Sequence, residues 1–276
     1  MPRALGVVYC RRMTIGPPDD DAPARVQVVV PCYNEAGRWN WDYWRDVFSI
    51  PDIEWLFVND GSTDGTQGVL DEITRTFGQP NLALRPNRGK AEAVRLGMLE
   101  ALGSGVEDGS MVGFMDADGS VAKSEVERFV RLARSQRMRD YDSIWASRVA
   151  LSGRHVIRTP RRHYIGRVVC TVLTVGYPEM PYDSQCGFKF FKTSPTLLET
   201  ISRPFETRWF IDIEMLQNWK RITGTPMRVW EEPLQWWEDM EGSHISTGGY
   251  VSILKDMTSV IRKGRALEKR RRTASA

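Results

Sequence analysis

Two carboxylates, Asp116 and Asp118, follow an apolar run that begins at Met111. Such a run is typical of a buried parallel strand, which delivers the residues after it to the carboxyl edge of a sheet. Two carboxylates separated by one small residue can share a hard cation such as Mg2+ or Mn2+, which also binds substrate phosphates. The pair therefore indicates a metal-assisted nucleotide site, although Asp-x-Asp alone is also typical of a solvated turn.

The elements that must position this pair follow from the hydrophobic pattern. Short apolar runs predict strands at residues 26–30, 53–58, 82–84, 111–115 and 143–146. Helical spacing predicts a helix after residue 65, with Ser62, Thr63 or Asp64 as its N-cap, and further helices over 91–102 and from 124 to about 138. This alternation predicts an α/β fold with a parallel sheet covered by helices on both faces.

A polar or charged side chain follows each predicted strand. The carboxyl ends of parallel strands meet at one edge, where open α/β sheets bind their ligands. Each side chain by itself is equally consistent with a helix cap or a solvated loop. Together they predict one charged crevice, whose candidate residues are Glu35, Asp60, Lys90, Asp116, Asp118 and Arg148.

Composition and charge narrow the class of protein. The chain has 276 residues, of which 41% are hydrophobic, enough for one large globular domain. Its net charge of +3 comes from residues 262–276, which carry seven Lys or Arg and one Glu, so the rest of the chain has 31 basic and 34 acidic groups. The basic groups are thus concentrated in a tail, predicted at 266–276, and this argues against a broad nucleic-acid-binding face.

Other patterns bear on the compartment. Cys10, Cys32, Cys170 and Cys186 are far apart and lack metal-ligand spacing, so we expect reduced thiols in a cytoplasmic protein. No apolar run reaches the roughly 20 residues that a membrane-spanning helix needs. Residues 1–24 predict a disordered leader. We therefore expect a cytoplasmic chain, with peripheral attachment to the inner face of a membrane as an option.

Several segments resemble a known family. VVVPCYNEAGR, FVNDGSTDGT, NRGKAEAVRLGM and FMDADGS resemble the nucleotide-sugar-binding half of family-2 inverting glycosyltransferases of the GT-A fold. YDSQCGFKFF, RWFIDIEML and GSHIS resemble the dolichyl-phosphate or polyprenyl-phosphate glucosyltransferase branch. The resemblance implies one GT-A domain over 25–265, built on a Rossmann-like, mostly parallel sheet flanked by helices. This domain would have a nucleotide-sugar half at 25–148, an acceptor half at 149–249 and a C-terminal amphipathic helix at 250–265.

The resemblance also implies an activity and a donor site. It implies metal-dependent transfer, with inversion, of a sugar, most simply glucose from UDP-glucose, to a polyprenyl or dolichyl phosphate. Mg2+ or Mn2+ would lie on Asp116 and Asp118, and Lys90 and Arg148 suit phosphate groups. The positions that the resemblance assigns to the nucleotide-sugar are Pro31, Tyr33, Glu35, Asp60, Lys90, Asp116, Ala117 and Asp118.

The acceptor side and the catalytic groups are implied in the same way. Arg148, Arg158 and Arg162 would receive the acceptor's phosphate, and the last two, four apart, are expected to share one helix face. Asp183, Asp118 and Asp212 are the catalytic candidates. Asp183 would act as a base for a hydroxyl acceptor, or would orient an acceptor that is already anionic. Asp212 either reaches the acceptor or supports the site structurally.

Alternatives remain open at this point. His244 stands where the branch usually has lysine, and a soluble hydroxyl-bearing small molecule or peptide could replace the lipid phosphate. A non-catalytic nucleotide-sugar-binding protein is a further hypothesis, and nucleic-acid binding through the tail is another. The apolar stripe at 250–261, followed by basic residues, predicts a helix that either lies on an anionic membrane or packs on the domain.

Overall fold

The computed structural model describes residues 25–103, 110–174, 177, 179–239 and 255–266. The strands are β1 (Val26–Cys32), β2 (Ile53–Asp60), β3 (Asn81–Leu84), β4 (Met111–Met115), β5 (Ser143–Ser147), β6 (His155–Ile157), β7 (Phe188–Lys192), β8 (Val229–Pro233) and β9 (Trp236–Glu238). Within the described residues, seven of them form one sheet in the order β3-β2-β1-β4-β7-β5-β8, and β6 pairs with β9 separately.

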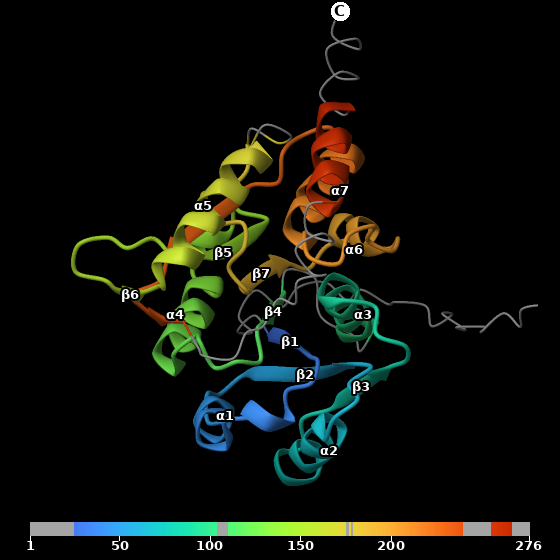
Figure 1. The fold of residues 1–276 in the computed structure, drawn as a ribbon, viewed down its shortest axis with the longest axis vertical. Coiled ribbons are helices and arrows are strands. Elements are labelled where there is room, and N and C mark those ends of the chain that lie inside the picture. Colours follow the sequence, from blue (N-terminus) through green and yellow to red (C-terminus); the bar gives the residue numbers. More distant parts are fainter. Residues whose placement is uncertain (1–24, 104–109, 175–176, 178, 240–254, 267–276) are drawn as a thin grey trace, which may run out of the picture.

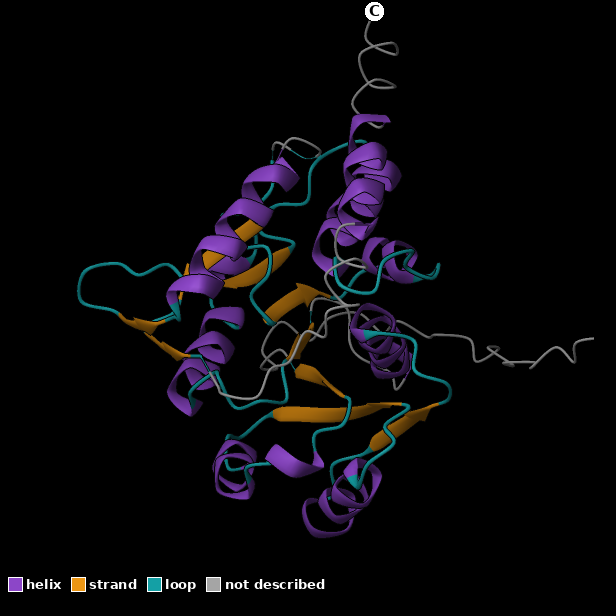
Figure 2. Cartoon of the chain, in the orientation of Figure 1, coloured by secondary structure: helices purple, strands orange, loops and turns teal. Residues whose placement is uncertain are grey.

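Helices cover both faces of the central sheet (Figure 1, Figure 2). They are α1 (Trp41–Phe48), α2 (Thr66–Phe77), α3 (Lys90–Gly103), α4 (Lys123–Ala133), α5 (Pro160–Thr174), α6 (Pro195–Ile201) and α7 (Ile211–Thr223), with a further helix at 255–266. Residues of α1, α2 and α4 belong to one hydrophobic core, and those of α3, α5, α6 and α7 to the other. The α/β fold class predicted from the sequence is confirmed.

Side-chain alternation along the strands builds these two cores. In β1, Val28 and Val30 lie in the core under α1 and α2, whereas Val29 lies in the core under α3. In β2, Phe57 and Val58 divide in the same way. All five side chains are fully buried. Because both faces are covered, β1 and β2 contain the continuous apolar runs Val28–Val30 and Trp55–Val58, as expected for the interior of a parallel sheet.

One strand runs against the others. β1, β2, β3 and β4 pair in parallel, and β5 pairs in parallel with β8, but β7 is antiparallel to both β4 and β5. The sheet is therefore mostly parallel, as predicted, and β7 is the strand of the seven that runs against its neighbours. The chain reverses in the turn at 182–187 and returns between β4 and β5.

Several predicted boundaries shift by a few residues. β1 continues through Pro31 because its ladder with β4 ends at Val29, so the missing proline N–H falls beyond that ladder. The N-cap of α2 is Gly65, while the Asp64 carboxylate accepts the Thr66 N–H at 3.0 Å. The helix predicted to reach residue 138 ends at 133, followed by a short 3-10 turn at 136–138.

The helix at 255–266 packs on the domain. Met257 and Val260 are buried in the core that contains α7, and the Gln217 amide donates to the Val260 carbonyl at 2.7 Å. Lys263 forms an ion pair with Glu206 at 2.8 Å. The packed alternative is thus confirmed for this part of the predicted 250–265 helix. The predicted disordered leader at 1–24, residues 267–276 of the predicted 266–276 tail, His244 and Cys10 lie outside the described residues.

Two further expectations concern the described part of the chain. Cys32, Cys170 and Cys186 are buried free thiols, as predicted. Among the described helices, none combines the length and apolarity that crossing a membrane requires.

Gly113 provides a test of the β4–β7 pairing. A Cβ added there would lie 2.2 Å from the Lys189 carbonyl oxygen and 2.3 Å from Cδ1 of Phe190. We expect Gly113→Ala to lower the free energy of unfolding by about 1–3 kcal/mol, because backbone and core must shift. Urea denaturation measures this change. The matched control is Gly68→Ala on the exposed face of α2, where nothing lies within 4 Å. Equal stability of the two variants would contradict the pairing.

Candidate active site

The loops that follow β1 and β2 form one wall of the site. Asn34 has a positive φ of 54°, and its N–H donates to the Ser62 hydroxyl at 3.0 Å. Its side-chain oxygen accepts the Thr63 N–H at 2.9 Å. The Glu35 N–H donates to the Thr66 hydroxyl at 2.8 Å. These contacts between residues far apart in the sequence fix the two loops to each other at the carboxyl edge of the sheet.

Three residues that the sequence analysis assigns to nucleotide-sugar binding lie on this wall, in different environments. The Tyr33 side chain is 47% exposed and therefore accessible to a ligand, whereas Pro31 is half-buried within β1. Glu35 is buried, and both of its carboxylate oxygens accept from the Arg38 guanidinium. Burial raises the pKa of Glu35, although the Arg38 bonds oppose this shift. Tyr33 is thus free to contact a nucleoside, while Glu35 is already paired.

Asp60 organises the loop that precedes α3. Its carboxylate accepts the backbone N–H groups of Arg88 at 2.7 Å and Gly89 at 2.8 Å. Its carbonyl oxygen accepts from the Asn87 amide at 2.9 Å. Burial raises the pKa of Asp60, and the two backbone donors counteract this shift. Asp60 thus lies at the carboxyl edge of the sheet, as predicted. Its carboxylate is hydrogen-bonded to the backbone of the loop before α3.

Asp116 forms an ion pair with Lys90 at the first residue of α3. The Lys90 ammonium lies 2.5 Å from Asp116 Oδ1, and about a third of each side chain is exposed. Burial favours the neutral amine, but the charges of Asp116, Asp212 and Asp118 outweigh burial and raise the pKa of Lys90. The predicted convergence of Lys90 and Asp116 is present, and Lys90 remains a cation at this edge.

Gly187 lets the chain approach the Asp116 carboxylate closely. The Asp116 N–H donates to the Gly187 carbonyl at 2.9 Å. A Cβ at residue 187 would lie 2.0 Å from Asp116 Oδ2 and 2.2 Å from its carboxyl carbon. Any side chain at this position must therefore displace the Asp116 carboxylate. Glycine is required here for space.

The Asp116–Asp118 pair suits a divalent cation that also binds a substrate. Ala117 between them is buried, while Asp118 is half-buried and Oδ1 accepts the Ser120 N–H at 3.0 Å. In the described part of the chain, no cluster of three His, Cys, Asp or Glu side chains could hold a metal ion alone. Two carboxylates completed by water and phosphate oxygens are a normal Mg2+ environment, so the residues fit such an ion.

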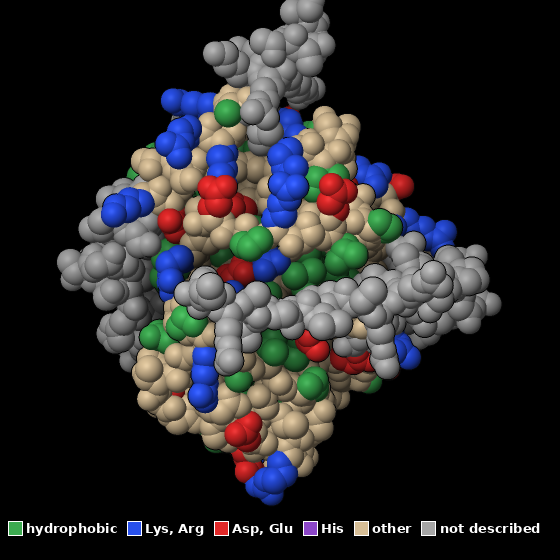
Figure 3. All heavy atoms as spheres, turned by 90° about the vertical axis from the view of Figure 1, so that its right-hand side faces the viewer, with side chains coloured by type: hydrophobic (Ala, Val, Ile, Leu, Met, Phe, Trp, Pro, Cys, Tyr) green, Lys and Arg blue, Asp and Glu red, His purple; other side chains and the backbone are tan. Residues whose placement is uncertain are grey.

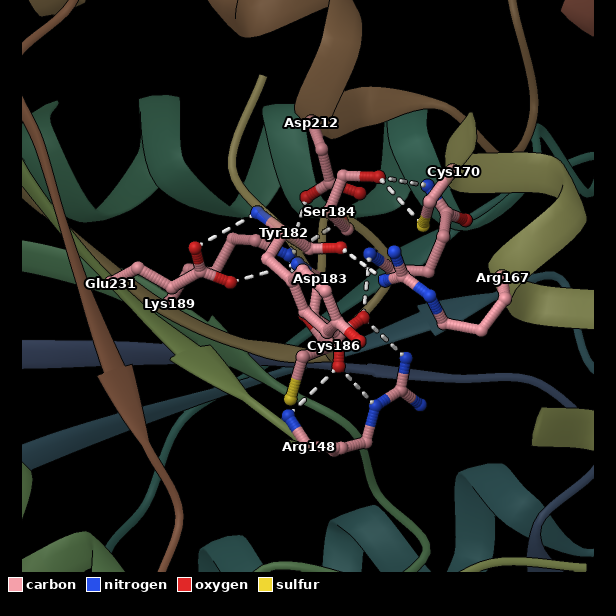
Figure 4. A network of polar contacts seen from close by, with 11 residues as sticks. Arg148, Arg167, Cys170, Tyr182, Asp183, Ser184, Cys186, Lys189, Asp212 and Glu231 are labelled. Atoms are coloured by element: carbon pink, nitrogen blue, oxygen red, sulfur yellow. Dashed lines mark hydrogen bonds and ion pairs between the residues drawn. The ribbon is translucent and has the colours of Figure 1, made fainter. Parts of the chain in front are cut away.

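Arg148, which follows β5, and Asp183 of the 182–187 loop form a bidentate ion pair (Figure 4). Arg148 Nε donates to Asp183 Oδ2 and Nη2 to Oδ1, both at 2.8 Å, and the Arg148 backbone N–H also donates to Oδ2 at 2.9 Å. Burial would raise the pKa of Asp183, but the Arg148 charge and bonds outweigh it and hold this pKa well below its ordinary value. Asp183 is therefore a weak proton acceptor.

Arg158 lies next to this pair, and the indole of Trp237 connects them. The Arg148 and Arg158 guanidinium carbons lie 5.3 and 5.9 Å from the Trp237 ring centroid. Burial and the nearby Arg148 charge lower the pKa of Arg158. Arg158 Nε is buried and has no hydrogen-bond partner among the described residues. Two adjacent arginines, one with an unused donor, form a cationic position suited to an anion.

The prediction that Arg158 and Arg162 share a helix face is wrong. Arg158 lies in the link between β6 and α5, because α5 begins at Pro160. Proline favours the first turn of a helix and disfavours helical geometry at the residue before it, here Thr159. Arg162 lies within α5. The two arginines therefore belong to different elements.

The sequence interpretation missed the groups that hold the 182–187 loop. Glu231 of β8 accepts the N–H groups of Tyr182 at 2.8 Å and Asp183 at 2.7 Å. Arg167 of α5 stacks on the Tyr182 ring at 3.6 Å and donates to the Tyr182 carbonyl at 3.0 Å. Lys189 of β7 donates to the Ser184 carbonyl at 2.9 Å. The three charged side chains come from three separate elements, α5, β7 and β8, and local pattern alone gives no sign of this convergence.

Asp212 is buried near the start of α7, 4% exposed, and pairs with Lys189 at 2.7 Å. Burial raises the pKa of Asp212, and the Lys189 charge opposes it. The geometry therefore supports the structural alternative for Asp212 over direct contact with an acceptor.

Basic side chains are distributed unevenly on the surface. In Figure 3, which views the right-hand side of Figure 1, Lys and Arg gather in the upper half, where α6 and α7 lie, more than in the lower half. In this view, the half that contains α6 and α7 therefore carries more basic side chains than the other half.

Comparisons with known proteins agree with this geometry. Residues 27–195 match the profile of glycosyl transferase family 2. Dolichyl-phosphate beta-glucosyltransferases of Trichomonas vaginalis and Saccharomyces cerevisiae are 28% and 27% identical, over 84% and 87% of this chain and 69% and 75% of theirs. The human protein of that name is 26% identical over 80% of this chain and 75% of its own.

Solved structures share the fold at low identity. Glucosyl-3-phosphoglycerate synthase from Mycobacterium tuberculosis, in complex with Mn2+, UDP and glucosyl-3-phosphoglycerate, has a TM-score of 0.55 at 15% identity, over 90% of this chain and 80% of that one. The mannosyltransferase PcManGT from Pyrobaculum calidifontis, with GDP-Man and Mn2+, has a TM-score of 0.50 at 16% identity, over 96% and 80%. The chain belongs to glycosyl transferase family 2, and it is a GT-A glycosyltransferase similar to the dolichyl-phosphate beta-glucosyltransferases.

Proposed function

We propose that this enzyme transfers glucose from UDP-glucose, with inversion, to a dolichyl or polyprenyl phosphate, and that Mg2+ or Mn2+ assists the reaction. The names of the relatives from Trichomonas, yeast and human support the sugar and the acceptor. The Mn2+ and UDP bound in the mycobacterial structure support the metal and the nucleotide. The chain's own contacts support the cation, the diphosphate and the phosphate acceptor.

The observation that carries the proposal is the Arg148–Asp183 pair. A hydroxyl acceptor must lose its proton, which requires a positioned base with a suitable pKa. Both Asp183 oxygens accept from Arg148, and the pKa of Asp183 is held well below its ordinary value. A phosphate acceptor arrives as an anion and needs no strong base. Arg158, with a buried unused Nε donor beside Arg148, offers this anion a hydrogen bond.

On the donor side, the charges suit a nucleoside diphosphate. Asp116 and Asp118 would hold the cation, which when bound neutralises the diphosphate as the glycosidic bond breaks. Lys90, already at Asp116, is a cation within reach of the same phosphates. The exposed Tyr33 ring is the accessible surface for the nucleoside on the wall formed by the β1 and β2 loops.

With these roles, the reaction is a direct displacement at the sugar's anomeric carbon. The acceptor phosphate would lie against Arg148 and Arg158, and the diphosphate against Lys90 and the two aspartates. An acceptor oxygen that approaches the sugar from the arginine side displaces the diphosphate on the opposite side, which inverts the anomeric centre. Such a direct displacement needs no covalent enzyme intermediate. Asp183 acts by holding Arg148, and Asp212 by holding Lys189.

The first experiment tests donor and acceptor together. Purified protein with Mn2+ or Mg2+ should release UDP from UDP-glucose, and a short polyprenyl phosphate should raise this release at least about tenfold, because transfer to an oriented acceptor replaces slow hydrolysis. A panel of UDP- and GDP-sugars, with and without the lipid, measures this by nucleotide release.

The control for that experiment is Asp118→Asn, which should abolish the metal-dependent part of the release. Nucleotide release that requires a soluble hydroxyl-bearing molecule and does not change with the lipid would reject the proposed acceptor. The proposed donor would then stand. The absence of metal-dependent nucleotide binding would overturn both and favour a non-catalytic role.

Gly187→Ala tests whether the close approach to Asp116 serves the donor site. The added Cβ would displace the Asp116 carboxylate, so we expect affinity for UDP in the presence of Mn2+ to fall about tenfold or more, the usual effect of a misplaced ligand group. Calorimetric titration measures this. Gly68→Ala makes the same substitution with no atoms nearby and should bind as the unaltered protein does. Equal affinity of both variants would refute the role of this contact.

A further inference from the structure

Lys189 carries a charge in the interior of the protein. Its side chain is fully buried in β7, on the sheet face that α3, α5 and α7 cover. The ammonium lies 4.7 Å from the Trp145 ring centroid and 5.5 Å from that of Phe114. Removing an ammonium ion from water costs several kcal/mol even after the protein relaxes, unless partners compensate. A buried lysine at this position therefore needs a structural reason.

The partners of the ammonium group explain its position. Lys189 donates to the carbonyl oxygens of Ser184 and Cys186, and it forms the ion pair with Asp212 (Figure 4). An ammonium group has three N–H donors and no acceptor. Two loop carbonyls and one carboxylate from α7 thus surround it. The group connects the middle of the 182–187 loop to the start of α7.

Both ends of that loop contact proposed substrate-binding residues. Asp183 near its start holds the Arg148 guanidinium, and Gly187 at its end packs against the Asp116 carboxylate. The loop consists of turns, with no helix or strand to fix its middle. Glu231 holds only the N–H groups of residues 182 and 183. Between the contacts of Asp183 and Gly187, the Lys189 ammonium binds two carbonyl oxygens of the loop.

We infer that Lys189 is a positioning residue for glycosyl transfer, which fixes the 182–187 loop so that Arg148 on the acceptor side and Asp116 on the donor side keep their relative placement. Lys189 does not touch either substrate; it acts through Asp183 and Gly187. The inference rests on the proposed roles of Arg148 and Asp116. It goes beyond them by assigning their common support to a residue of the sheet interior.

A purely electrostatic role is the competing explanation. In that case Lys189 serves only to neutralise Asp212, and replacing both charges together should restore everything. Removing one partner of a buried pair leaves an uncompensated charge, whereas replacing both by neutral groups is often tolerated. The carbonyl bonds to Ser184 and Cys186 are lost in either case. The double variant therefore separates positioning from charge balance.

The experiment compares Lys189→Met, Asp212→Asn, the double variant and Lys192→Met. Lys192 lies on the same strand, is half-buried, and donates to the Arg139 carbonyl away from the loop. We expect Lys189→Met to lower the thermal midpoint and to reduce kcat about 100-fold, the scale of a roughly 1 Å misplacement. The double variant should recover much of the midpoint, while kcat stays low. Lys192→Met should match the unaltered protein in both.

A second readout does not depend on turnover. Hydrogen–deuterium exchange of the peptide that covers the 182–187 loop should quicken at least about tenfold in Lys189→Met and in the double variant, because the loop loses two of its anchors. Lys189→Arg, which retains the charge and donors, should slow this exchange again relative to Lys189→Met. Loop exchange in the double variant that matches Lys192→Met would overturn the inference, as would recovery of its kcat to within about threefold of the unaltered protein.

These outcomes are separable from failure of the proposed function. If the unaltered protein uses a soluble acceptor, kcat is measured with that acceptor and the same ranking of variants is expected. If the protein shows no turnover at all, the exchange data alone decide whether Lys189 fixes the loop. Unchanged exchange in Lys189→Met would then reject the inference independently of the acceptor.

Discussion

The ion pair between Arg148 and Asp183 is the interaction on which most of the site depends. It joins the end of β5 to the turn before β7, two segments with no backbone hydrogen bonds to each other at that point. Three donors of Arg148, including its backbone N–H, converge on one carboxylate. Because both partners are nearly excluded from water, each makes the burial of the other tolerable. The geometry of the cationic position therefore depends on this pair.

The sequence predicted the parts of the site that local pattern determines. The strand before Asp116 and Asp118 was predicted with its observed bounds, because an apolar run ended by carboxylates has few other interpretations. The convergence of Lys90 and Asp116 was predicted because each follows a strand whose carboxyl end lies at the same edge of the sheet. The spacing of four between Arg158 and Arg162 predicts one helix face. Pro160 lies between them and begins α5, so Arg158 lies before the helix and Arg162 within it.

Lys189 shows what local pattern cannot provide. In the segment Phe188 to Lys192, a lysine between phenylalanines is typical of a strand with one solvated face. Helices cover both faces of the sheet, and Lys189 in the middle of β7 is therefore buried. Lys192, the last residue of β7, is only half-buried. The difference arises from Asp212, which is close in space but belongs to α7. Asp60 gives the same lesson, since its carboxylate accepts from the backbone N–H groups of Arg88 and Gly89, which belong to a distant loop.

The insertion of β7 between β4 and β5 determines when the site can form. On a ribosome, β4 and the carboxylates that follow it are made well before β7, and in the described sheet β4 pairs only with β1 and β7. Until residue 192 has emerged, β4 presents an open edge that invites pairing with another chain. Closing that edge also brings Gly187 against Asp116. Pairing of β7 with β4 thus both covers this open edge and completes the corner of the site in which we propose that the metal binds.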